Sequence, residues 1–397
     1  MARSILLLLA LTVSPCFLGA QPDTEWLFHK TDDNAHPNGH EQQMFWLQNR
    51  ARTNPIEEGK WLVGDTLALP SNVTTEFNFR GISKQLVRDE FAAIPPKPPS
   101  AFDRRLYEAS KAHSEYMISI DTQTHDGQFQ RVSQAGFSGN GGAVSVFWRA
   151  QDGVHGHAVL NIDWGFDGGD GTGLQPGRGH RRSIHADNGL WTNAGLAMVE
   201  ENNTGTQAGP LVTSIAYYRA STFGTTDHYN RFIVGTIWTD SNGNSQYDPG
   251  EGHGGVTVMP DIGQFWATTA DSGGFAIPAT EQGTYTLTIS GGDLSAPQER
   301  IVQVADQNVL MIWNEVDKWP DPPVAEAPTL EVARTDLKAF SFMVKDGQSY
   351  QLRNTTDFST FQNDPRPFTI NGDSYSFEVT QDDIDTGTFF DILVTIP

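Results

Sequence analysis

The sequence predicts a multidomain protein, with a mixed helical and β region at the N-terminus followed by two β domains. Three observations lead to this fold class. The 397 residues exceed a typical domain of about 150 residues. Helical periodicities alternate with glycine-rich loops over residues 24–221, and short alternating strands follow from Phe232. A proline-rich stretch at residues 319–328 then precedes a second strand-like segment at residues 329–397.

The charge balance excludes a function that depends on binding nucleic acid. Lys and Arg number 26 against 48 Asp and Glu, which gives a formal net charge of −22 at pH 7. Such a chain repels phosphate backbones. Hydrophobic residues make up 38% and charged residues 19% of the chain, which is enough apolar material for packed cores. We therefore expect a folded, acidic protein with no nucleic-acid partner.

The first twenty residues predict a secretory signal peptide. Arg3 provides a basic start, residues 4–12 form an apolar run, and Leu18-Gly19-Ala20 offers a small-residue cleavage site. The run is too short to span a bilayer, and no later stretch reaches about 18 apolar residues, so we expect no transmembrane segment after signal removal. Cys16, the single cysteine, lies in this segment, and a lipoprotein acylated there is the alternative. A cysteine-free, acidic mature chain favours a bacterial secreted, extracellular or cell-envelope protein.

Two helices are predicted in the first domain. Met44, Leu47 and Ala51 recur at helical spacing, and Pro55 closes the pattern. A second helix is predicted over residues 103–120, with Asp103 as its N-cap and His113 on the apolar face that packs into the core. The full division predicted from these patterns is a signal peptide at 1–20, a first domain at 21–225, a β domain at 226–317, a linker at 318–328 and a small β domain at 329–397.

Histidines gather in the second half of this first domain. Six of the eleven histidines of the chain fall between His113 and His185. Imidazole is the side chain best suited to proton transfer near neutral pH and to binding divalent metals. The clustering indicates a shared site, although histidines in loops can also be simply solvated.

The order of motifs in this region resembles the CAP superfamily, the cysteine-rich secretory, antigen 5 and pathogenesis-related proteins, also called SCP-like extracellular domains. The motifs are LQNRARTNP at residues 47–55, AFDRRLYEASKAHSEYM at 101–117, His125 in its loop, GHRRSI at 179–184 and a glycine-bearing strand near 193–198. The resemblance covers about half of the chain. It implies an α-β-α sandwich in which helices cover both faces of a small, mostly antiparallel sheet, with a groove between them.

The resemblance also implies a metal-binding groove with two histidines and two acids. His125 and His180 match the two histidines. Residues 141–144 read Gly-Gly-Ala-Val where the family has Gly-Glu-Asn, so the first acid is missing. His157 and Asp163 are candidates for the remaining positions, although Asp163 could equally be a turn or cap residue. Three imidazoles and a water would suit zinc or another divalent metal.

Binding is the leading functional hypothesis. The chain has no Gly-x-Ser-x-Gly elbow, no HExxH motif and no usable cysteine. We therefore expect an extracellular binding or interaction module whose ligand is a polymer, a lipid or a protein. The alternative is a metal-dependent extracellular hydrolase that acts through His125, His157 and His180. A purely architectural adhesin with a vestigial groove is the third possibility.

The segment TDSNGNSQYDPGE has the spacing of a calcium-binding loop. Twelve-residue loops of this kind place their ligands at positions 1, 3, 5, 7, 9 and 12. Those positions are occupied by Asp240, Asn242, Asn244, Gln246, Asp248 and Glu251. Position 6 holds Ser245 where glycine is usual. The sequence predicts a structural calcium site, and the alternative is a polar loop without metal.

The surroundings of this loop resemble the B-type repeats of bacterial surface adhesins and related prealbumin-like β-sandwiches. Predicted strands at 232–239 and 256–259 flank the loop, and Gly-Thr-Tyr-Thr-Leu follows at 283–287. The resemblance implies a β-sandwich stiffened by calcium. In the last segment, alternating runs at 339–344, 349–352, 375–379 and 389–395 predict a second small β-sandwich, whose role the sequence does not indicate.

Overall fold

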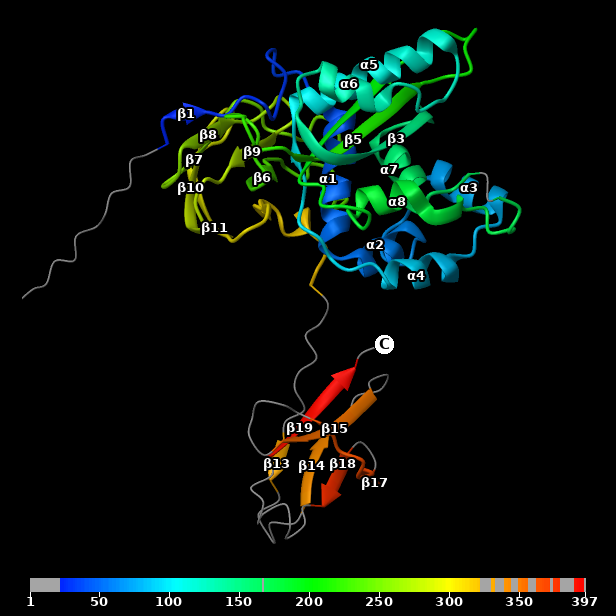
Figure 1. The fold of residues 1–397 in the computed structure, drawn as a ribbon, viewed down its shortest axis with the longest axis vertical. Helices are drawn as coiled ribbons and strands as arrows, with labels where there is room; N and C mark the ends of the chain where they lie inside the picture. Colours follow the sequence, from blue (N-terminus) through cyan, green and yellow to red (C-terminus); the bar gives the residue numbers. More distant parts are fainter. Residues whose placement is uncertain are drawn as a thin grey trace, which may run out of the picture. The chain divides into compact units, whose positions relative to one another are not determined.

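The protein is a mixed α/β chain that divides into two compact units. The computed structural model describes residues 22–165, 168–321, 330–332, 339–343, 349–355, 362–371, 374–378 and 389–395. The first unit ends at Pro320 and the second begins at Asp321 (Figure 1). Helices and several sheets confirm the predicted mixed, multidomain architecture at this level. The predicted signal peptide and linker residues 322–328 lie outside the described residues.

A four-stranded sheet with helices on both faces forms the first part of the first unit (Figure 1). Its strand order is β2-β4-β5-β3, with all pairs antiparallel except β2 with β4. The strands are β2 (Ala101–Phe102), β3 (Gly139–Ala150), β4 (Asn193–Glu200) and β5 (Leu211–Ala220). The helices are α1 (Gly39–Thr53), α2 (Pro55–Leu62), α3 (Ser71–Arg80), α4 (Lys84–Ala92), α5 (Arg104–Ile120), α6 (Gln128–Gln134), α7 (Gly153–Ile162) and α8 (Gly179–Ile184).

The side chains of β5 alternate between the two faces of the sheet, and helices cover both faces. Ala216 and Tyr218 pack with Leu106 of α5 and Val132 of α6. Ile215 and Tyr217, two residues apart, point the other way and pack with residues of α1 and α7. Successive side chains of a strand point to opposite faces, so a strand buried on both sides requires helices above and below it.

The two predicted helices form, with one difference at Pro55. α5 begins after Asp103, whose side chain accepts a hydrogen bond from the backbone N–H of Arg105, and His113 is fully buried. α1 ends at Thr53, as the pattern predicts. Pro55 does not merely end that helix but occupies the first turn of α2, where a missing N–H costs nothing, and Asn54 caps this second helix.

The β-sandwich of the first unit consists of a five-stranded and a three-stranded sheet. The strand orders are β1-β8-β7-β10-β11 and β12-β6-β9. The strands are β1 (Thr24–Glu25), β6 (Phe232–Thr236), β7 (Val256–Pro260), β8 (Phe265–Thr268), β9 (Gly274–Pro278), β10 (Gly283–Gly291), β11 (Gln298–Val304) and β12 (Val309–Leu310). β1 pairs in parallel with β8, so the start of the described chain lies in the sandwich and not with the helices that follow it.

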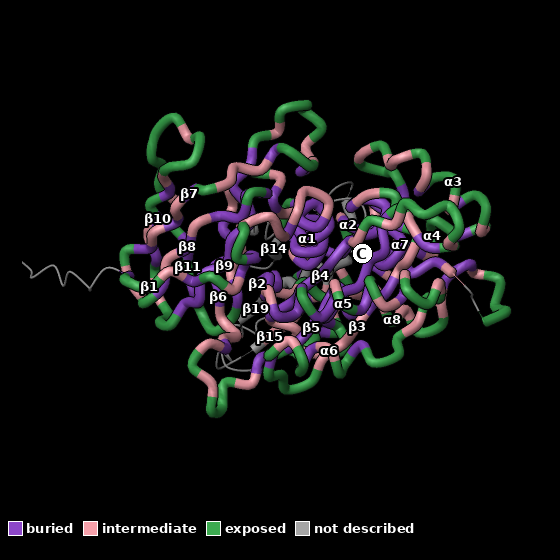
Figure 2. The backbone as a smooth tube through the Cα atoms, turned by 90° about the horizontal axis from the view of Figure 1, so that it is seen from above, coloured by how far each residue is buried: buried purple, intermediate pink, exposed green. Residues whose placement is uncertain are grey.

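Helix α1 lies between the helical layers and the sandwich. Every residue from Glu41 to Arg52 is buried, and Figure 2 shows this helix buried along its length. Two of its glutamines form hydrogen bonds across the junction. The Gln42 amide donates to Thr236 Oγ1 at 2.8 Å, and the Gln43 amide donates to the Tyr247 carbonyl at 3.0 Å. These contacts explain why a helix with polar residues can be buried on all sides.

The segment after the sandwich closes the first unit. Asp317 is buried, and its Oδ1 accepts the indole N–H groups of Trp46 at 3.0 Å and of Trp238 at 2.7 Å. Trp319 falls in the stretch predicted as a linker, yet it is buried and donates its indole N–H to Glu58 at 2.8 Å. The chain therefore stays packed on α1 and α2 as far as residue 319.

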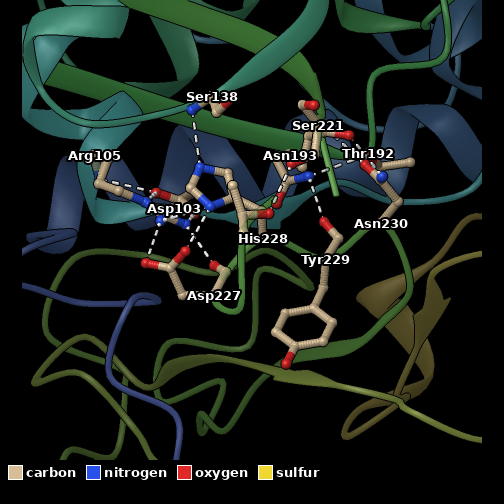
Figure 3. A network of polar contacts seen from close by, with 12 residues as sticks. Asp103, Arg105, Ser138, Thr192, Asn193, Ser221, Asp227, His228, Tyr229 and Asn230 are labelled. Atoms are coloured by element: carbon tan, nitrogen blue, oxygen red, sulfur yellow. Dashed lines mark hydrogen bonds and ion pairs between the residues drawn. The ribbon is translucent and has the colours of Figure 1, made fainter. Parts of the chain in front are cut away.

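A polar network fastens the connection between β5 and β6 to the helical part (Figure 3). Arg105 bridges Asp103 and Asp227. His228 lies beside Asp227, with its Nδ1 2.7 Å from the carboxylate, and its Nε2 accepts the backbone N–H of Ser138 at 2.8 Å. The connection is thus bonded to α5 and to the start of β3. It ties together the two halves of the first unit, which are the helical part and the β-sandwich.

The second unit contains two small sheets. Their orders are β13-β14-β18-β17 and β16-β15-β19. The strands are β13 (Leu330–Val332), β14 (Ala339–Met343), β15 (Ser349–Thr355), β16 (Gln362–Asn363), β17 (Thr369–Asn371), β18 (Ser374–Glu378) and β19 (Phe389–Thr395). Strands lie at each of the four alternating runs predicted from the sequence. Among the helices of the described residues, none is both long and apolar enough to cross a membrane.

Replacing Asp317 by Asn tests how much the hydrogen bonds of its carboxylate stabilise the first unit. The amide N–H₂ of Asn would face either two indole N–H donors or the backbone N–H groups of Trp313 and Asn314 that bond Oδ2. We expect Asp317→Asn to lower the free energy of unfolding by about 2–4 kcal/mol. The exposed Glu315 of the same turn gives the matched control, because Glu315→Gln should change stability by less than about 0.5 kcal/mol. Urea unfolding followed by tryptophan fluorescence measures both, and equal stabilities would contradict the assignment.

Candidate functional site

The two histidines expected in the groove lie together in a cleft at the edge of the four-stranded sheet. The cleft has a volume of about 500 Å³ and lies between His125 and Phe129 on one side and His180 on the other, with residues 142–144 of β3 along it. β3 is the edge strand of its sheet, so the cleft forms where the strand has no further neighbour. The ring centres of His125 and His180 are 6.4 Å apart, and the ring planes differ by 26°.

His180 is oriented by Asp163. Asp163 adopts a left-handed conformation (φ 61°) at the end of α7, which turns its carboxylate toward the start of α8. Its Oδ1 lies 2.8 Å from His180 Nδ1, and its Oδ2 accepts the backbone N–H of His180 at 3.0 Å. A carboxylate accepts hydrogen bonds, so Nδ1 carries a proton, and in the neutral ring Nε2 is the nitrogen with the lone pair. Asp163 is completely buried and therefore positions His180 while remaining out of the cleft itself.

His125 is oriented in the same way by Gln128. The distance from His125 Nδ1 to Gln128 Oε1 is 2.8 Å. The amide nitrogen of Gln128 is already engaged, because it donates to Ser214 Oγ at 2.8 Å and to the Ser145 carbonyl at 3.2 Å. Its oxygen is thus the group that faces His125, which places the proton on Nδ1 and leaves Nε2 as an acceptor. The cleft therefore presents two imidazoles with the same free nitrogen.

The structure does not bring His157 to this pair. His157 is completely buried, with Nε2 2.6 Å from Glu58 Oε1, and Asn161 donates to the same oxygen at 3.0 Å. His185 lies next in this buried group, 3.0 Å from Asn161 Oδ1. Burial, together with the nearby arginines, lowers the pKa of His185 well below its usual value.

Glu58 and Gln128 are two residues that sequence reasoning missed. Burial by itself raises the pKa of Glu58, but His157, Arg50 and the Trp319 indole stabilise its carboxylate, so the pKa is lowered overall. The available signal for Glu58 is its helical spacing with Trp61 and Leu62, which places it on the buried face of α2. For Gln128 the signal is its position three residues after His125, within reach of that side chain.

The predicted calcium loop is a compact turn in which several of the expected ligands converge. The amides of Asn242 and Asn244 both donate to Asp248 Oδ2, at 2.7 and 2.6 Å. Glu251 accepts the backbone N–H of Ser241 at 2.9 Å. The Asp240 carboxylate accepts backbone N–H groups of the turn, among them Ser245 at 3.0 Å.

Three further observations bear on the expected metal sites. Ser245 has φ 61°, so position 6 of the loop adopts the left-handed conformation for which glycine is usual. The loop is docked on α1, because the Gln43 amide also donates to Asp248 Oδ1 at 2.8 Å. Within the described part of the chain, no group of three or more His, Cys, Asp or Glu side chains is arranged to hold a metal ion.

Comparisons with known proteins assign this chain to no family. No protein-family model, no curated protein and no solved structure matches it. The CAP-like and adhesin-like interpretations therefore remain predictions from the motifs.

The orientation of His180 can be tested through its tautomer. Asp163→Asn can place an N–H₂ group opposite Nδ1, so we expect loss of the single Nδ1-protonated form and a mixture of tautomers. Long-range ¹H–¹⁵N correlation spectra of histidine-labelled protein report this directly. The exposed Asp126, next to His125 in sequence, provides the control, because Asp126→Asn should leave the His180 signals unchanged. An unchanged tautomer in Asp163→Asn would contradict the assigned role.

Proposed function

We propose that this chain is an exported binding or interaction module of the CAP type, which recognises an extracellular ligand at the His125–His180 cleft. The observation that supports this proposal is the pair of imidazoles that line the cleft, each fixed through Nδ1 and each without a hydrogen-bond partner at Nε2 among the described residues. Such preorganisation is typical of binding sites, because the orientation of the recognising groups is set before the ligand arrives. Export rests on the signal-like residues 1–20 alone.

A divalent metal fits the cleft only in part. Two imidazole nitrogens suit zinc or a similar ion, and each ring is held at Nδ1 by an oxygen acceptor, as metal-bound histidines usually are. A zinc site usually needs three or four ligands, and no carboxylate lines the cleft. The remaining positions would have to be filled by water or by the ligand itself, which favours weak metal binding and a recognition role.

The hydrolase alternative rests on one specific observation. The buried Asp163 orients His180 as carboxylates orient a general-base histidine. Ser183 also lines the cleft, but it is buried and its hydroxyl donates to the Gly179 carbonyl at 2.9 Å, so it is not presented as a nucleophile. We therefore favour binding over hydrolysis.

Calorimetric titration of the full chain with Zn²⁺ tests the cleft. We expect one weak site, whose affinity falls by at least about 100-fold in His180→Ala and by roughly 10-fold in Asp163→Asn. His253, whose ring is engaged with Thr239 and Asp293 in the sandwich, offers the control, and His253→Gln should bind as the parent does. Binding that survives His180→Ala would contradict a metal role of the pair. Chelator-sensitive turnover of a polymer substrate, lost in His180→Ala, would instead support the hydrolase.

For the second site, we propose that residues 240–251 bind a structural calcium ion. The donor set supports this, since carboxylate, amide and carbonyl oxygens fill the spaced positions and the backbone at position 6 has the required left-handed conformation. Because the loop contacts α1 through Gln43, an ion there would stiffen the junction between the sandwich and the helices.

Thermal unfolding with and without calcium tests the loop. A site with the affinity of extracellular modules should add about 1–3 kcal/mol at 10 mM Ca²⁺, and so raise the Tm by a few degrees. Glu251→Gln should abolish the shift. The exposed Glu299 on β11 supplies the matched control, and Glu299→Gln should keep the full shift. The same Tm with Ca²⁺ and with a chelator would show that the loop is polar but metal-free.

A further inference from the structure

A second pocket opens where the helical layers meet the β-sandwich. Its volume is about 440 Å³, and it shares no lining residue with the histidine cleft. The walls come from the proline-rich connection at residues 96–99, the loop at 186–192, the end of β5 and the turn at 306–308 between β11 and β12. Both halves of the first unit are therefore needed to form it.

This pocket is basic in a strongly acidic protein. Arg52, Lys97 and Arg219 line it, and Asp306 is its single acidic residue. The chain as a whole carries a net charge of −22, so the local balance is reversed. Among the described residues, neither the Lys97 ammonium nor the exposed Arg219 guanidinium forms an ion pair. Basic groups that lack counter-ions in a concave site attract anions.

Arg52 lies buried at this pocket without a negative partner. Its Nε donates to the Ile184 carbonyl at 2.5 Å, and its Nη1 donates to the carbonyls of Trp191 at 3.0 Å and Pro98 at 3.3 Å. Its Nη2 has no hydrogen-bond partner in the described part of the chain. Burial lowers the pKa of Arg52 to about 10, so the group remains charged at neutral pH.

The other buried arginines show how unusual this arrangement is. Arg50 lies near Glu58 and Asp317, Arg105 pairs with Asp103, and Arg181 pairs with Glu90. A buried charge is costly unless an opposite charge compensates it. Of the four buried arginines that the structure describes, Arg52 alone has no carboxylate among the groups that act on its charge, so its charge is available to a bound anion.

An apolar wall completes the pocket. Leu190 is 64% exposed, and Trp191 lines the pocket beside it. The indole is held in place, because its N–H donates to Asn188 Oδ1 at 2.7 Å. Its ring also lies so close to Gly189 that a Cβ there would come within 2.1 Å of it. A fixed aromatic surface next to cations suits a ligand with a flat or apolar body.

The pocket walls are preformed by hydrogen bonds across the junction. Thr192 donates to Asn230 Oδ1 at 2.6 Å, and the backbone N–H of Ala220 donates to the same oxygen at 2.8 Å (Figure 3). Asn308 in the sandwich donates to the carbonyls of Pro99 and Thr192, both at 2.8 Å. Both N–H groups of the Asn308 amide are occupied, so recognition of charge at this wall falls to the basic residues.

We infer that this pocket binds a small organic carboxylate, with the carboxylate held by Lys97 and Arg219 above the buried charge of Arg52 and the ring or apolar body against Trp191. This site is separate from the proposed histidine cleft and does not depend on it.

The test uses 4-fluorobenzoate as the probe, observed by ¹⁹F NMR with the full chain. The neutral isostere 4-fluorobenzamide separates charge recognition from simple apolar binding. We expect line broadening and a saturable shift for the carboxylate, little effect for the amide, and weaker binding as salt is raised. Equal binding of the two compounds, or binding of neither, would overturn the inference.

Variants then locate the site. Lys97→Gln combined with Arg219→Gln removes the two accessible cations, and should weaken 4-fluorobenzoate binding by about ten-fold or more without touching a buried residue. Lys111→Gln with Arg149→Gln removes the same charge at positions that do not line the pocket, and should leave binding unchanged. Equal weakening in both double variants would show an effect of net charge alone and contradict a specific site. His180→Ala should keep full binding, which separates this pocket from the histidine cleft.

Discussion

The structure of the first unit depends on one buried guanidinium, that of Arg50, and on the groups that compensate its charge. The guanidinium lies over three indole rings, with its centre 4.0 Å from the Trp319 ring and 4.7 Å from that of Trp46. The carboxylates of Glu58 and Asp317 provide the opposite charge. Each carboxylate in turn accepts indole N–H groups, so tryptophans from both halves of the unit surround one charged centre. A buried charge compensated in this way holds distant segments together, because removing any one partner leaves another uncompensated.

The contacts around Arg50 hold the two halves together, and all three candidate sites lie in this first unit. The histidine cleft is built on the helical layers, the loop proposed to bind calcium rests on α1 through Gln43, and the basic pocket exists only where both halves meet. Stiffness at the junction therefore sets the geometry of two of the three sites. It also explains how a chain without a disulfide framework among the described residues can support preformed pockets, since the indole and amide contacts across α1 supply the cross-links.

The sequence predicted individual helices and strands better than it predicted how they pack together. Local signals were sufficient for α5 with its Asp103 cap, for the strands β6 and β7, and for β14, β15, β18 and β19 of the second unit. Pairing of His125 with His180 was also anticipated, from motif order. The participation of β1 in the sandwich was not predictable, because a two-residue parallel pairing between Thr24 and Phe265 leaves no periodic pattern. Nor could the sequence show that His157 turns to Glu58, since that contact depends on the packing of α2 against α7.

Hydrogen exchange of the full chain at increasing urea concentrations tests directly whether the two halves form one cooperative unit. We expect backbone amides of β4 and β5 in the helical part and of β6 and β9 in the sandwich to lose protection together, in a single cooperative step. In Trp319→Phe, which removes an indole N–H from Glu58, both sets should shift to lower urea by the same amount. Loss of protection in two separate steps, with only one set affected by Trp319→Phe, would contradict the claim that the two halves form one cooperative unit around Arg50.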